Sequence, residues 1–131
     1  MKKLSILILP LLLAACASKP AATPEEVAMT FLASVINDWG EHKLKFVDSK
    51  SRARLKSLCD AAKKRGIALK PDELLVSIPQ ARDNWLGKKS TKIITRTDTT
   101  AVVEITTTAN APKITLDLVK EGGEWKVSVL E

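Results

Sequence analysis

The spacing of apolar residues changes near Thr91, and this change limits the folds that the chain can adopt. Before Thr91, apolar residues recur every three or four positions, as on one face of a helix. After it, they alternate with polar residues, as in a strand with one buried face. Helices followed by strands with short turns predict an α+β domain, in which helices cover one face of an antiparallel sheet.

The first helix has the clearest signals. Thr23 is a favourable N-cap residue, and Glu26 stands three positions later, where it completes a capping box. An apolar stripe then extends to Trp39 at helical spacing. We expect the helix to end at Gly40, as the left-handed residue that follows many helices.

Further helical segments precede the change of period. They are expected at 41–47, from 48 or 49 to 65, and from about 70 onward. Gly66 follows the long segment and Ile67 follows the glycine, which is the pattern of a Schellman closure. Strands are expected at 92–97, 103–107, 114–118 and 125–129, with turns at 98–100, 110–112 and 121–123. Together these strands predict an antiparallel meander.

The N-terminus has the pattern of an export signal. Two lysines are followed by an apolar run over 4–13 and by Ala14-Ala15, and the run is too short to span a bilayer. The sequence Leu-Ala-Ala-Cys at 13–16 resembles the bacterial lipobox, which implies cleavage between Ala15 and Cys16 and a diacylglyceryl group on Cys16. We therefore expect a signal peptide at 1–15, a lipidated cysteine with its linker at 16–22, and an α+β domain at 23–131.

Lipidation of Cys16 would make the membrane the first partner of this protein. Ala17 stands where lipoproteins kept in the inner membrane usually have aspartate, so the resemblance implies the outer membrane, facing the periplasm. A Gram-positive surface is the alternative. The linker is short, and seven residues reach about 25 Å at most. The domain is therefore expected to lie close to its membrane.

Positive charge is concentrated in one predicted helix. The chain has 21 Lys and Arg residues against 15 Asp and Glu, and seven of the basic residues lie within 48–65. Arg52, Lys56 and Lys63 follow one stripe, which suggests contact with an anionic surface, either a membrane or an acidic partner. The other interpretation is an ordinary solvated helix face. Without a platform of basic and aromatic residues, nucleic-acid binding is not expected.

Three segments resemble a known family: TPEEVAMTFL at 23–32, DWG at 38–40 and LVKEGGEWKV at 118–127. They are similar to bacterial lipoproteins of the nuclear transport factor 2-like superfamily, in its branch of unknown function. The resemblance implies a long first helix packed into a curved antiparallel sheet, which together form a cone with a pocket at the open end. Relatives include ketosteroid isomerase, scytalone dehydratase and polyketide cyclases, beside many members without catalysis.

Enzymes of that superfamily use an aspartate or histidine in the pocket, often with a tyrosine. This chain has no tyrosine and one histidine, His42, in a polar stretch where a solvated side chain is expected. The candidates for a pocket are Asp38, Trp39, Trp85 and Asp117. We favour a non-enzymatic binding or scaffold domain whose partner is an envelope protein or a small apolar ligand. The alternative is a small isomerase, dehydratase or cyclase that uses Asp38 or His42.

No metal or cofactor is expected, because neither a spaced set of ligands nor a glycine-rich phosphate loop is found. Cys59 would be a lone thiol if Cys16 is lipidated. It shares a helical face with Leu55, Leu58 and Ala62, which predicts a buried and unreactive side chain. Trp125 alternates with polar residues in the last strand, and core packing is expected for it.

Overall fold

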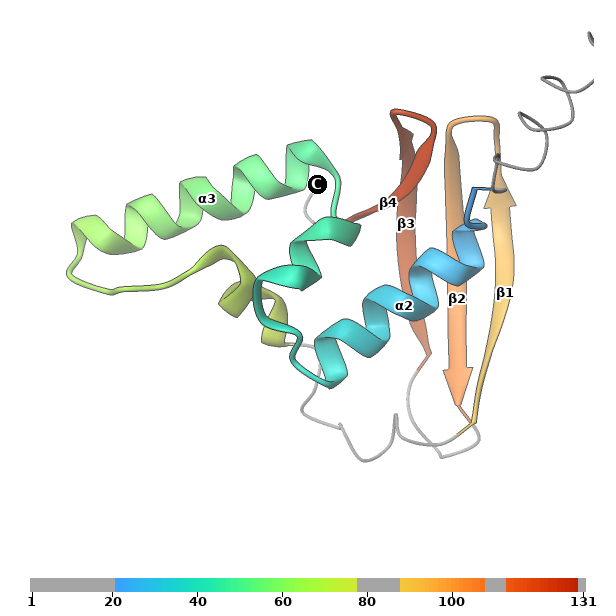
Figure 1. The fold of residues 1–131 in the computed structure, drawn as a ribbon, viewed down its shortest axis with the longest axis horizontal. Coiled ribbons are helices and arrows are strands. Elements are labelled where there is room, and N and C mark those ends of the chain that lie inside the picture. Colours follow the sequence, from blue (N-terminus) through green and yellow to red (C-terminus); the bar gives the residue numbers. More distant parts are fainter. Residues whose placement is uncertain (1–20, 78–87, 108–112, 130–131) are drawn as a thin grey trace, which may run out of the picture.

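The computed structural model describes residues 21–77, 88–107 and 113–129, and these residues form the predicted α+β fold (Figure 1). The predicted signal at 1–15, Cys16 and Trp85 lie outside the described residues. Helical elements come first and a four-stranded sheet follows. The elements are α2 (Pro24–Ile36), the 3-10 helix η2 (Gly40–Phe46), α3 (Ser49–Lys64), the 3-10 helix η3 (Pro71–Ser77), β1 (Lys89–Arg96), β2 (Thr100–Thr107), β3 (Ile114–Glu121) and β4 (Glu124–Ser128).

The sheet is the predicted antiparallel meander, with the strands in chain order and β1 and β4 at its two edges. Val103 lies opposite Leu116, and Leu118 lies opposite Val127. These residues face α2, which packs across one face of the sheet (Figure 1). Burial of each large apolar side chain contributes about 1.5–3 kcal/mol. The finer expectation of a curved cone is compatible with this arrangement and stays a prediction.

The start of α2 confirms the predicted capping box. The Thr23 hydroxyl accepts the Glu26 N–H at 3.2 Å, and the Glu26 carboxylate accepts the Thr23 N–H at 3.4 Å. One turn of α2 buries Phe31 and Leu32 almost completely. The polar start and the apolar stripe thus fix both where α2 begins and which face it buries.

The predicted end of the first helix is wrong. The helix ends at Ile36, and Asp38, with φ of 50°, is the left-handed residue that follows it. Gly40 is left-handed as predicted, with φ of 60°, but it begins η2 and does not end α2. The Trp39 N–H donates to the Ser34 carbonyl at 2.9 Å, which completes a Schellman closure around Asp38. Aspartate tolerates this conformation better than most residues because its side chain is short and polar. Trp39 therefore leaves the buried stripe and is 42% exposed.

The long helix α3 begins and ends as predicted. Asp48 is its N-cap, and its carboxylate accepts the Ser51 N–H at 3.1 Å. Gly66 is left-handed after the helix, with φ of 81°, and the Ile67 N–H donates to the Ala62 carbonyl at 3.0 Å.

One expectation for the apolar face of α3 is wrong. Leu55 and Cys59 are buried, but Leu58 is 43% exposed. The physical reason is that α3 extends away from the sheet, so little of the protein covers its second half (Figure 1). No helix in the described ranges combines the length and the apolar character needed to cross a membrane.

The chain segment before α3 covers the β4 edge of the sheet. Val47 forms an isolated parallel bridge with Val127. The Asp48 N–H donates to the Val127 carbonyl at 3.0 Å, and the Val129 N–H donates to the Ser51 hydroxyl at 3.1 Å. These contacts fix the first turn of α3 against the sheet.

Candidate functional site

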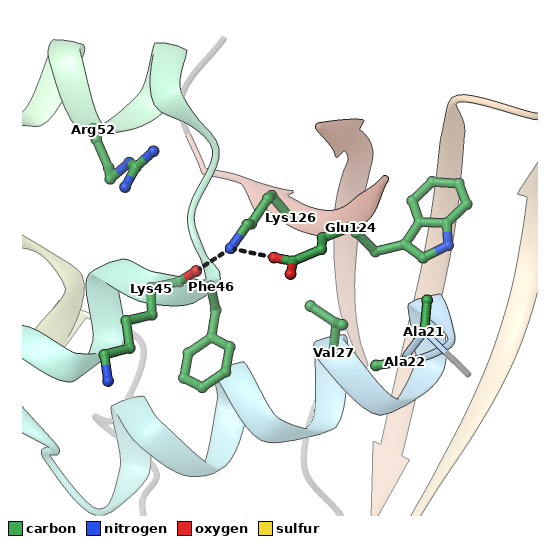
Figure 2. Close-up of a pocket in the computed structure, with 9 residues that line it drawn as sticks. Ala21, Ala22, Val27, Lys45, Phe46, Arg52, Glu124 and Lys126 are labelled. Atoms are coloured by element: carbon green, nitrogen blue, oxygen red, sulfur yellow. Dashed lines mark hydrogen bonds and ion pairs between the residues drawn. The ribbon is translucent and has the colours of Figure 1, made fainter. Parts of the chain in front are cut away.

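A groove of about 780 Å³ lies where α2 begins (Figure 2). It is bordered by the end of η2, the first turns of α3 and strand β4. This volume is within the range of about 300–1,000 Å³ found for small-molecule sites. The lining residues are Ala21, Ala22, Val27, Lys45, Phe46, Arg52, Glu124, Trp125 and Lys126.

The apolar part of the groove is formed by Val27, Phe46 and Trp125. Trp125 is 4% exposed, so the prediction that it packs in the core is confirmed. Two cations lie over its ring, with the Arg96 guanidinium carbon 5.6 Å and the Lys120 Nζ 5.5 Å from the ring centroid. Cations above an aromatic face are attracted by its electron-rich centre. Trp125 is therefore buried beneath the groove, and Phe46 is the half-buried aromatic residue of the lining.

The polar rim carries Lys45, Arg52 and Lys126 against one carboxylate, Glu124. Lys126 is held in place because its Nζ donates to the Lys45 carbonyl at 2.7 Å and pairs with a Glu124 carboxylate oxygen at 3.3 Å (Figure 2). Arg52 pairs with Glu121 outside the lining at 3.6 Å. Lys126 and Arg52 are thus each paired with a glutamate, and the small excess of positive charge that remains on the rim favours a ligand that carries an acidic group.

Glu121 fixes the base of α3 beside the groove. Its carboxylate accepts the Ser49 N–H at 3.1 Å and the Ser49 hydroxyl at 2.9 Å. These hydrogen bonds, the backbone one first, lower the pKa of Glu121 from its ordinary value; the charges of Arg52 and Lys126 add to the effect, and partial burial opposes it. An ionised carboxylate at a helix N-terminus also interacts favourably with the helix dipole.

The structure does not bring the sequence-predicted pocket residues together. Asp38 and Trp39 follow the end of α2, whereas the groove lies at its start. Asp117 is exposed between two buried leucines of β3, so its side chain is on the sheet face turned away from α2. None of these three lines the groove, and Trp85 lies outside the described residues.

Asp38 has a structural role in the described part of the chain. Its carboxylate accepts a hydrogen bond of 2.8 Å from the Lys43 Nζ. The Lys43 side chain is 1% exposed and that of Asp38 is 68% exposed, so Asp38 supplies the charge that a buried ammonium group requires. His42 is exposed, as expected.

The predicted basic stripe begins in the groove and continues along α3. Arg52 lines the groove, Lys56 is exposed one turn later, and Lys63 lines a second hollow of about 480 Å³ between α3 and residues 68–73.

Cys59 lines the same hollow and is 8% exposed. Burial raises the pKa of its thiol, and the charge of Asp60, followed by those of two more acidic residues on η3, raises it further. A raised pKa disfavours the reactive thiolate.

The groove as a set was not predicted from the sequence, because its lining comes from separate segments of the chain. The sequence signal that could have indicated the groove is a cation next to an aromatic residue, which occurs at Lys45-Phe46 and at Trp125-Lys126.

In residues 21–77, 88–107 and 113–129, no three His, Cys, Asp or Glu side chains lie together as metal ligands would. Comparisons with protein-family models, with curated proteins and with solved structures found no match.

Proposed function

We propose that this chain is a lipid-anchored protein of the bacterial envelope whose α+β domain binds a partner and catalyses no reaction. The groove at the start of the domain carries the proposal. Ala21 and Ala22, the first described residues, line it directly. The five Cα–Cα steps from Cys16 to Ala21 span about 18 Å at most, so lipidation of Cys16 would hold the groove beside the bilayer.

The chemistry of the groove supports a partner with an apolar part and an acidic group. Phe46 offers half-buried aromatic surface, and Lys45 and Arg52 contribute positive charge to the lining. An envelope protein segment or a small amphiphilic ligand has this combination. The resemblance of the leader and of Ala17 to outer-membrane lipoproteins supports a location on the outer membrane, facing the periplasm.

The enzymatic alternative has less support. An enzyme of the nuclear transport factor 2-like type would place its acid or base in a cavity with the substrate. Asp38 pairs with the buried Lys43 at 2.8 Å, and His42 is exposed; neither residue lines the groove. We therefore propose the binding function.

The first experiment tests the anchor. The full chain is produced in a Gram-negative bacterium, and its N-terminal peptide is analysed by mass spectrometry after cell fractionation. We expect cleavage before Cys16, the added mass of diacylglycerol and acyl groups, and release from membranes by detergent. Cys16→Ser should abolish all three, whereas the control Cys59→Ser should leave them intact. An unmodified thiol at Cys16 in the wild-type protein would overturn the proposal.

The second experiment tests the groove. A photo-crosslinking amino acid replaces Phe46 in the lipoprotein in living cells, and the matched control carries it at Lys113, whose side chain is 67% exposed at the far end of the sheet. We expect a discrete adduct from position 46 that Lys45→Glu weakens, and none from position 113. The same adducts at both positions, or none at position 46, would contradict a binding role of the groove.

A further inference from the structure

Helix α3 is a basic helix that projects from the sheet (Figure 1). Its 16 residues extend over about 24 Å at about 1.5 Å per residue. Buried side chains are confined to Ser51, Leu55 and Cys59. Asp60 is its one acidic residue, and its exposed cations are Lys50, Arg52, Arg54, Lys56, Lys63 and Lys64.

The base of α3 lies at the end of the molecule where the N-terminal segment enters. Arg52 of α3 and Ala21 line the same groove. The Lys120 N–H donates to the Thr99 carbonyl at 2.8 Å and joins the β1–β2 turn to the end of β3. The end of β3 in turn holds the first residue of α3 through Glu121. Both hairpin turns and the base of α3 therefore belong to one end of the domain, which Figure 1 shows at the top.

We propose that α3 docks on the anionic phospholipid headgroups of the bilayer that anchors the protein. The inference rests on the proposed function, because a lipid on Cys16 would hold Ala21 within about 18 Å of the bilayer. Arg52 at the base of α3 lies across the groove from there. Arg52 pairs with Glu121 at 3.6 Å, and the five other cations of α3, against its one carboxylate, match a negatively charged surface. Each lysine or arginine near such a surface contributes a factor of about five to the affinity.

The side chains of α3 indicate contact with headgroups without insertion. Leu58, at 43%, is the large apolar residue of α3 that is exposed. A helix that inserts into the interface needs a broad apolar face with aromatic or leucine side chains. The docking of α3 is therefore electrostatic, and added salt weakens it because the Debye length shortens.

The test uses the complete lipoprotein in vesicles of phosphatidylcholine, with and without phosphatidylglycerol. Exposed amines are acylated briefly, and the modification of each lysine is measured by mass spectrometry. Phosphatidylglycerol should slow the acylation of Lys50, Lys56 and Lys64 about fivefold, and high salt should restore it. Lys113, at the opposite end of the sheet, is the internal control and should react equally in both vesicles.

A pair of charge reversals tests whether the cations of α3 cause this protection. Lys50→Glu with Lys56→Glu changes two exposed positions of α3, of which Lys50 lies in the first turn, where the helix dipole favours an acidic residue. This variant should remove the protection of Lys64. The matched control, Lys88→Glu with Lys113→Glu, changes the net charge equally at the far end of the sheet and should retain that protection. Unchanged circular dichroism of both variants verifies that they fold.

The outcomes separate the two proposals. Protein that fails to float with either vesicle overturns the anchor, and with it the docking of α3. The docking alone is overturned if the protein floats with both vesicles and Lys56 and Lys64 are each acylated at the same rate with and without phosphatidylglycerol. Protection that requires an added acidic protein instead of phosphatidylglycerol also overturns it, in favour of a protein partner.

Discussion

The carboxylate of Glu121, the last residue of β3, accepts hydrogen bonds from the N–H and the hydroxyl of Ser49, the first residue of α3. The two residues are 72 positions apart in the chain. Glu121 thus joins the β3–β4 hairpin to the base of α3. It neutralises part of the positive charge there and orients the start of the helix.

Glu121→Gln should destabilise the protein by about 1 kcal/mol at neutral pH, because a charged acceptor forms stronger hydrogen bonds than an amide and because the Glu121 side chain, 35% exposed, is partly screened by water. The pKa of Glu121 lies below its ordinary value of 4.5 in the folded state. Its contribution is therefore complete above about pH 4.5 and is lost as the pH falls through the folded-state pKa.

Urea unfolding of the wild type and of Glu121→Gln at a series of pH values measures this contribution. The difference in unfolding free energy should shrink in acid. The control Asp98→Asn changes an exposed carboxylate in the β1–β2 turn and should have little effect. A difference between wild type and Glu121→Gln that stays constant with pH would contradict the role of the charge.

Asp48→Ala should cost about 1–2 kcal/mol, because it removes the side chain that caps α3 at Ser51. Asp48 is 5% exposed, so water replaces the lost acceptor poorly. Asp48→Asn keeps an acceptor and should retain most of the stability. Asp60→Ala, in the exposed middle of the same helix, is the matched control. Equal effects of Asp48→Ala and Asp60→Ala in urea unfolding would refute the capping argument.

Asp38→Asn should destabilise the protein by about 1–3 kcal/mol, because it leaves the buried Lys43 ammonium without its charged partner. Asparagine tolerates the left-handed backbone, so the effect isolates the charge. Lys43→Met removes the buried charge and should be neutral or stabilising. In the Lys43→Met background, Asp38→Asn should then cost little. A double-mutant cycle from thermal or urea unfolding measures this coupling, and additive effects would exclude it.

The Cys59 thiol should react slowly with a thiol-specific disulfide reagent in the folded protein. Burial and the negative charge of Asp60 raise its pKa, so little thiolate is present at neutral pH. Ser57→Cys on the exposed face of α3, in a Cys59→Ser background, is the control and should react much faster. Unfolding in urea should bring both to the same rate. Equal rates in the folded protein would show that Cys59 is accessible.

Local signals in the sequence predicted most of the fold. The capping box at Thr23 and the glycine after α3 act within one helical turn, and alternation along a strand reflects burial of one face of that strand. Interactions of this range can be recognised without knowledge of the fold. For the same reason the order of helices and strands, and the position of Trp125 in the core, were predicted correctly.

One error is local, at the end of α2, whereas the other error and the omission of the groove depend on how distant segments pack. The closure at Asp38 instead of Gly40 goes with an ion pair to a buried lysine. Leu58 has the spacing of a core residue, but no element of the described chain covers that part of α3 enough to bury it. The groove requires Lys45 to meet Lys126 across 81 positions. The spacing of apolar residues along the chain does not indicate a contact between such distant residues, so the groove could be found only from the structure.

The segment that covers β4 limits how this sheet can pair with other copies of the chain. The bridge from Val47 to Val127 and the Asp48 hydrogen bond occupy the strand edge to which another copy could add. In the described part of the sheet, β1 remains as the edge for pairing. Two molecules that join β1 to β1 use up both of these edges, so growth stops at a pair. The lipid anchor that we propose would raise the local concentration of the protein, and the single open edge of the described sheet prevents edge pairing from extending into a continuous fibril.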